Sequence, residues 1–251
     1  KKVHLEEKRM RISILNRITI SESTLQKLKQ FFLRKSRNTE AIIEKLVKLG
    51  YFIEKEDDEG HYIHDFRNKY NNLLKTRTEK LSEEEKPKVW LAPDFGGKCA
   101  YCAKSYAHQM LGISGGRNIF ADIPESIVEI DPEEVTTKNP DIIIRYLSGK
   151  DAGDISKIKV LWEDMMNRPE LANVNAMKTR RIYMIDQNLQ YGLYYPVAVA
   201  YWAKWMHPDL FHDLNPLAIH EEFQTKFGAL DYNLYKHGIF VYHPEQHSEG
   251  K

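Results

Sequence analysis

Two cysteines three positions apart, Cys99 and Cys102, are the pattern in this chain that most directly suggests chemistry. A CxxC pair at a helix N-terminus can serve as a redox couple, because the helix dipole favours the thiolate, and we expect a helix to begin near Ala103. The pair could also close a local disulfide or supply half of a metal site, but zinc needs two further ligands and the chain holds no second CxxC. We therefore favour structural or incidental cysteines, with metal binding by Cys99 and Cys102 as the alternative.

A second group of candidate side chains combines aromatic rings with polar tips. Most of it lies in two loops, PDFGGKCAYC at 93–102 and DQNLQYGLYYP at 186–196. A tyrosine offers flat apolar area together with a hydroxyl group, so these loops suit a flat, oxygen-rich ligand. For Tyr194 and Tyr195, the alternative is packing at the start of the next helix. The expected ligand-binding residues are Asp94, Lys98, Tyr101, Tyr146, Gln187, Gln190, Tyr191, Tyr194 and Tyr195.

The sequence carries none of the short motifs that mark common enzyme and nucleotide-binding classes. It has no GxxxxGKS or GxxxxGKT, no GxGxxG after a strand, no HExxH and no GxSxG. No nucleophile, base and orienting residue can be recognised as a set, so we expect a binding protein and not an enzyme. His61 and His64 share one helix face, but without a third ligand we interpret them as solvated side chains.

Composition and charge narrow the class of protein further. The 251 residues are 42% hydrophobic and 29% charged, which is enough apolar material for a folded core. Lysine and arginine number 37 against 36 aspartates and glutamates, and this net charge of +1 gives no reason to expect nucleic acid as a partner. No apolar run reaches the roughly 18 residues of a membrane span. The first residues, KKVHLEEKRM, show no apolar core of a signal peptide.

Strands and helices that alternate along the chain should position the candidate side chains. Helical spacing predicts a long helix at 62–80, ended by the charged stretch SEEEKPK at 82–88. Beyond it, the pattern predicts strands at 89–92, 141–146 and 181–185, a short run at 118–121, and helices at 103–111, after Asp131, at 155–167, 196–206 and 217–227. Such alternation indicates an α/β fold, a three-layer lobe with a mainly parallel central sheet.

The expected organisation has three parts. Residues 1–60 form a short, mainly helical N-terminal segment, with a strand at 11–20 and a helix at 39–49. Residues 61–81 form a long linking helix, and residues 82–251 form the C-terminal α/β lobe. Ligands of open α/β sheets bind beyond the carboxyl ends of the strands, so the loops after Ala92, Tyr146 and Ile185 should line a cleft.

Five blocks of the chain, taken in order, resemble a known family. They are TRTEKLSEEEKPKVW at 76–90, SGGRNIFAD at 114–122, NPDIII at 139–144, ELANVNAMKTRRIYMID at 170–186 and AYWAKWMHPDLFHDLNPLAIHEEF at 200–223. They resemble the class III periplasmic (solute-)binding proteins, which deliver iron-siderophores, haem or vitamin B12 to ABC importers, and in particular the archaeal iron-transport type. The resemblance extends over roughly residues 45–245.

This resemblance implies a non-enzymatic receptor of two α/β lobes joined by one long helix, with the ligand held between the lobes. A complete member has a whole lobe before the linking helix, whereas only about sixty residues stand there in this chain. Residues 1–60 would then be a remnant of that first lobe or a divergent segment. The resemblance implies no required cofactor, an iron chelate, haem or cobalamin as the transported ligand, and an extracytoplasmic location, periplasmic or anchored at the cell surface.

The expected partners follow from the same resemblance. Members of the family dock on the importer permease through an exposed acidic residue on each lobe, and Glu125 is the expected residue here, with Glu133 or Glu134 as second choice. An ordinary solvated carboxylate is the alternative for each. A lobe face that should meet a second lobe is partly apolar, so we also expect self-association as a homodimer.

One further interpretation belongs to a different class of protein. Residues 39–64 can be interpreted as a recognition helix followed by a wing, as in winged-helix DNA-binding domains. The wing would contain EKEDDEG, and such an acidic wing repels phosphate. An interaction module of this kind, like a CxxC metal or redox protein, is an alternative to the receptor.

Overall fold

The computed structural model describes residues 62–93, 96–148, 151, 153–190, 194–225 and 240–245. All of them belong to the second of two compact units of the chain, residues 62–251. The strand expected at 11–20, the helix expected at 39–49 and most of the winged-helix alternative at 39–64 lie outside the described residues.

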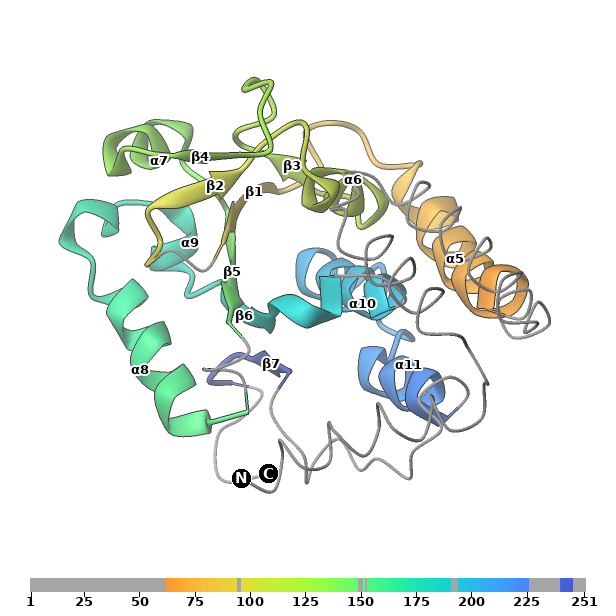
Figure 1. Ribbon diagram of the computed structural model, residues 1–251. Helices are drawn as coiled ribbons and strands as arrows, with labels where there is room; N and C mark the ends of the chain where they lie inside the picture. Colours follow the sequence, from red (N-terminus) through yellow and green to blue (C-terminus); the bar gives the residue numbers. More distant parts are fainter. Residues whose placement is uncertain are drawn as a thin grey trace, which may run out of the picture. The chain divides into compact units, whose positions relative to one another are not determined.

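A five-stranded sheet forms the centre of this unit (Figure 1). Its spatial order is β3, β1, β5, β6, β7. The strands are β1 (Lys88–Ala92), β3 (Arg117–Asn118), β5 (Ile142–Leu147), β6 (Ile182–Asp186) and β7 (Val241–Tyr242). The first four run parallel, and β7 pairs antiparallel with β6. The mainly parallel sheet predicted from the sequence is confirmed.

Helices cover both faces of the sheet and complete a three-layer arrangement. One face carries α5 (Asn68–Thr78), which continues the π-helical turn η1 (Tyr62–Arg67), together with α6 (Tyr106–Ile113), α10 (Tyr195–Met206) and α11 (Pro216–Phe223). The other face carries α7 (Pro132–Lys138), α8 (Ile155–Met166) and the short α9 (Asn175–Lys178). Two 3₁₀ turns, η2 (Pro169–Leu171) and η3 (Gln187–Gln190), complete the connections. Figure 1 shows α8 and α10 on opposite sides of β5 and β6.

The central strand explains why the sheet needs two helical layers. All six residues of β5, IIIRYL, are buried, as is typical of a parallel strand covered on both faces. Ile144 and Tyr146 enter the core on the α10 side, whereas Ile143 and Leu147 enter the core on the α8 side. Alternation along one apolar run therefore supplies both cores.

The helix expected after Asp131 has the predicted start and end. The Asp131 side chain accepts a hydrogen bond from the backbone N–H of Glu133, and Pro132 occupies the first helical position. Asn139 ends the helix in a left-handed conformation, with φ of 48°. After two further residues, the chain enters β5.

The main departure from the expected elements is a small second sheet. The strand β2 (Cys99–Tyr101) pairs antiparallel with β4 (Ile127–Glu129) in a segment expected to be loop. The helix expected near Ala103 begins only at Tyr106, so that expectation is wrong by one turn. The reason is that the backbone N–H groups of Ala103 and Lys104 donate to carbonyls of the segment before β4 instead of entering a helix.

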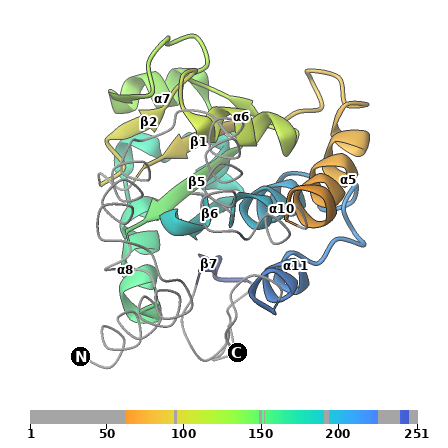
Figure 2. The same cartoon turned by 45° about the vertical axis from the view of Figure 1, so that its right-hand side comes forward.

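The predicted long helix is fastened to the lobe along its length. The Tyr70 hydroxyl donates to the Glu222 carboxylate of α11, and Arg77 forms an ion pair with Asp213 in the loop between α10 and α11. Figure 2 shows α10 and α11 beside α5. The described part of this helix therefore belongs to the same folded unit as the sheet.

Candidate functional site

The carboxyl ends of β1, β5 and β6 form the edge of the sheet where the sequence predicts a ligand. Of the nine expected residues, Asp94 and Tyr191 lie outside the described residues. The other seven fall into three groups: a buried cluster, two tyrosines at the start of α10, and two polar side chains nearer the surface.

Three of the expected residues come together in the buried cluster. Tyr101 from β2 and Tyr146 from β5 meet edge to face, with ring centroids 5.2 Å apart. Gln190, at the end of η3, donates from Nε2 to the Tyr101 hydroxyl at 3.4 Å. Trp202 of α10 extends the group, with its ring centroid 6.2 Å from that of Tyr146. We call Tyr101, Tyr146, Gln190 and Trp202 the aromatic–amide cluster.

Two polar atoms of the aromatic–amide cluster have no hydrogen-bond partner among the described residues. They are Oε1 of Gln190 and Nε1 of Trp202, on side chains that are 1% and 0% exposed. A buried polar atom without a partner costs about 1–3 kcal/mol. One open acceptor and one open donor therefore belong to a cluster whose other groups are aromatic rings and hydroxyls. Tyr101, Tyr146 and Trp202 belong to the hydrophobic core on this side of the sheet, so the two open atoms are neutral groups in apolar surroundings.

The two tyrosines at the start of α10 pack against neighbouring helices. The Tyr195 hydroxyl accepts hydrogen bonds from Asn71 Nδ2 at 2.6 Å and from Arg67 Nε at 2.9 Å, and its side chain is buried. The Tyr194 ring lies against Phe223, with centroids 4.4 Å apart, and its hydroxyl accepts from Gln224 at 3.3 Å. Both contacts correspond to the packing alternative stated for these two residues.

The remaining expected residues lie closer to solvent. Lys98 is exposed and Gln187 is half-buried. Neither side chain forms a hydrogen bond with the aromatic–amide cluster within the described ranges. The structure therefore does not bring them into the group that Tyr101, Tyr146 and Gln190 form.

The cysteine pair lies in a strand and not at a helix N-terminus. Cys99 is half-buried in β2 and Cys102 is buried just after it, and both thiols are free. Burial, together with the nearby Asp122 carboxylate, raises the pKa of the Cys102 thiol to about 11, and burial also raises the pKa of Cys99. A redox or zinc-binding cysteine needs an accessible thiolate, which this environment disfavours. Within the described residues, no three His, Cys, Asp or Glu side chains lie close enough to hold a metal ion.

The acidic residues expected to meet a permease are accessible. Glu125 is exposed in the segment before β4, and Glu133 and Glu134 are exposed in the first turn of α7. The structure thus leaves all three carboxylates open to a partner.

Sequence reasoning missed Trp202 as a member of the site. It did predict the helix that carries it, and that helix is apolar on nearly all sides, which indicates full burial. An indole N–H in a fully buried helix normally finds an acceptor. That signal pointed to Trp202, but its position beside Tyr146 depends on the packing of α10 on the sheet.

Comparison with known proteins agrees with this fold. The model of the periplasmic binding protein family matches residues 17–189, well over half of the chain. The chain therefore belongs to the periplasmic binding protein family.

Solved structures of such proteins have the same fold. FepB of Veillonella parvula, a TroA-like periplasmic binding protein, superposes with a TM-score of 0.70 and 22% identity over 81% of this chain and 61% of that one. MolA of Haemophilus influenzae, solved with molybdate bound, superposes with a TM-score of 0.64 and 16% identity, over 76% of this chain and 57% of MolA. CeuE of Helicobacter pylori, solved in a nickel–histidine complex, superposes with a TM-score of 0.62 and 16% identity, over 78% of this chain and 61% of CeuE.

The chain spans about three fifths of the length of these solved proteins. No curated protein sequence matches it. Within the described residues, no helix has the length and apolar character needed to cross a membrane.

Proposed function

We propose that this chain is the substrate-binding component of an ABC importer, or a lobe of one, and that it captures a metal chelate and delivers it to the permease. The observation that carries the proposal is the aromatic–amide cluster at the sheet edge where α/β folds hold their ligands, in a chain of the periplasmic binding protein family. Binding, and not catalysis, is the activity proposed.

The proposed ligand class is an iron-siderophore, haem or cobalamin. Neutral aromatic and amide groups suit a large, flat, oxygen-rich chelate better than a small bare anion, which needs cationic groups or many N–H donors. The resemblance to archaeal iron-transport members supports the same class. An extracytoplasmic location and docking on the permease through Glu125 complete the proposal.

A thermal-shift screen of the full chain tests this function. Candidate ligands are ferric siderophores, haem and cobalamins, with molybdate, nickel–histidine and free divalent metals for comparison. A ligand that binds only the folded state stabilises it by about 2.7 kcal/mol at a hundredfold excess over its Kd, so a true ligand raises the melting temperature. We expect one chelate to do so and the bare metals to have no such effect.

Two variants tie that shift to the aromatic–amide cluster. Gln190→Leu removes the amide, and Tyr101→Phe removes the hydroxyl group that accepts a hydrogen bond from that amide. Each variant should weaken binding of the chelate about tenfold. Tyr183→Phe is the matched control, because its ring stacks on Trp205, with centroids 4.5 Å apart, outside the aromatic–amide cluster. A well-folded protein that responds to no chelate would overturn the proposal.

A further inference from the structure

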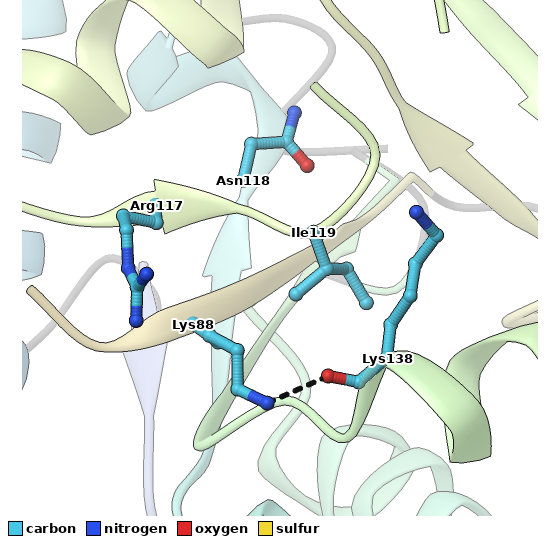
Figure 3. A pocket seen from close by; sticks show the side chains of 5 residues that line it. All are labelled: Lys88, Arg117, Asn118, Ile119 and Lys138. Atoms are coloured by element: carbon cyan, nitrogen blue, oxygen red, sulfur yellow. Dashed lines mark hydrogen bonds between the residues drawn. The ribbon is translucent and has the colours of Figure 1, made fainter. Parts of the chain in front are cut away.

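A basic hollow lies at the opposite end of the sheet, where β1 and β3 begin (Figure 3). Its volume is about 220 Å³, and it is lined by Lys88, Arg117, Asn118, Ile119 and Lys138. A single water needs only about 10–15 Å³ of such space. The hollow therefore has room for a ligand group of several heavy atoms.

The strand register places two positive charges next to each other in this hollow. Lys88 and Arg117 are direct partners in the parallel pairing of β1 with β3. Side chains of paired residues lie on the same face of a sheet, and like charges in such positions repel. Neither residue forms an ion pair with an acidic side chain in the described part of the chain. An anion between the two would remove this unfavourable juxtaposition.

Each of the two cations is held in place by one backbone carbonyl. Lys88 Nζ donates to the carbonyl of Lys138 at 2.8 Å, and Arg117 Nε donates to the carbonyl of Lys86 at 2.9 Å. An ammonium group has three donors and a guanidinium has five, so most donors of both groups have no acceptor among the described residues. Figure 3 shows the two side chains extending in the same direction, with the Lys138 ammonium group turned away.

The nearby acids are engaged with other groups. Asp122 pairs with Lys138 at 2.9 Å, and Glu83 pairs with Lys86 at 2.6 Å. The charge of Arg117 also contributes to the lowered pKa of Glu83, but without a direct contact. Asp141 accepts from the backbone N–H of Lys88 and from the Asn175 amide. The positive charge of Lys88 and Arg117 is therefore not cancelled by a direct carboxylate contact.

We propose that the basic hollow binds a tetrahedral oxyanion, a phosphate group, between Lys88 and Arg117. The two terminal nitrogens of Arg117 can hold two oxygens of one phosphate side by side, and Lys88 Nζ supplies the second charge. Ile119 forms an apolar wall beside them. The phosphate comes either from solution or from a lipid headgroup. This site is separate from the chelate site and does not depend on it.

Calorimetric titration of the full chain with inorganic phosphate tests the proposal. The buffer is free of phosphate and sulfate and is kept at constant ionic strength, so that general screening does not change. We expect saturable binding that Arg117→Gln weakens about tenfold, and that Arg117→Lys weakens less because the charge remains. The matched control is Lys178→Gln, which removes one charge from an exposed residue of α9.

A parallel experiment identifies the source of the phosphate. Co-sedimentation with vesicles of phosphatidylcholine alone, or with added phosphatidylglycerol, measures headgroup binding. Binding to the anionic vesicles that Arg117→Gln removes and Lys178→Gln retains supports a lipid source, and saturable binding of free phosphate alone supports a soluble one. If neither phosphate nor anionic vesicles bind, or if Arg117→Gln and Lys178→Gln behave alike, the proposal is wrong.

Discussion

Asn71 on the long helix donates a 2.6 Å hydrogen bond to the hydroxyl of Tyr195 on α10, and both side chains are buried. The same hydroxyl accepts from Arg67 at 2.9 Å. One phenol oxygen thus joins η1 and α5 to the helix that covers the sheet, and its loss leaves two donors without that acceptor.

We therefore expect Tyr195→Phe to lower the free energy of unfolding by about 1–3 kcal/mol. Tyr194→Phe is the control, because the Tyr194 hydroxyl accepts only one long hydrogen bond, 3.3 Å from Gln224. This variant should lower the free energy of unfolding by less. Urea denaturation of both variants measures the difference. If Tyr195→Phe instead leaves stability unchanged and weakens ligand binding, Tyr195 lines the cleft and does not serve packing.

Thiol chemistry should distinguish the two cysteines. Burial raises the pKa of Cys102 to about 11, so this thiol stays protonated near pH 7 and should react only after unfolding. The half-buried Cys99 should react in the folded protein, but more slowly than free cysteine, because its pKa is raised as well. Titration with a disulfide reagent should count one thiol in buffer and two in denaturant. Rapid reaction of both in the folded protein would instead support the redox alternative.

Acid should destabilise the fold through His220. Burial lowers the pKa of this side chain from 6.5 to about 4, so between these values the unfolded chain binds the proton and the folded chain does not. The free energy of unfolding is therefore highest above pH 6.5, where the side chain is neutral in both states. It falls by about 3 kcal/mol in total as the pH decreases toward 4.

Replacement of His220 by Phe should flatten that pH dependence. The test is urea denaturation of wild type and His220→Phe at several pH values between 7 and 4. An exposed histidine, His212, replaced by Gln serves as the control. An unchanged slope in His220→Phe would show that other groups cause the acid sensitivity.

Gly115 should tolerate no side chain. Its φ is +81°, and an added Cβ would lie 2.8 Å from Thr78 Cγ2 and 2.9 Å from His207 Nε2. We expect Gly115→Ala to lower the free energy of unfolding by more than about 1 kcal/mol, because backbone strain at positive φ adds to the steric clash of the new Cβ. Gly112, inside α6, has open space around its Cβ position, so Gly112→Ala should stabilise the fold by about 0.5–1 kcal/mol. Thermal unfolding of the pair measures both effects, and equal effects would refute this reasoning.

The sequence predicted the large elements well, because each had a strong local signal. The apolar run of β5 and the capping residues Asp131 and Asn139 each specify their element within a few residues. The strands β2 and β4 have only three residues each and carry no clear apolar alternation, so their pairing depends on contacts distant in sequence. Because the pairing of β2 with β4 was missed, the helix after Cys102 was placed one turn too early, which left a redox role of the CxxC pair open as an alternative.

Sequence reasoning could bring together residues whose proximity follows from strand topology, but not a residue whose position depends on helix packing. Tyr146 lies near the carboxyl end of β5 and Gln190 follows the neighbouring parallel strand β6, so the sheet brings them to one edge. Trp202 joins them only because α10 crosses the sheet at that point. The binding role of this group remains a prediction until a ligand is measured.

The two residues of β7 have a consequence for how copies of this chain behave toward one another. β6 is almost wholly apolar, and β7 covers its outer edge by pairing with Met184 and Ile185. An uncovered apolar edge strand is a template on which a strand of another molecule can add. We therefore expect this short pairing to protect the protein against aggregation, and a chain shortened before residue 240 to lose that protection.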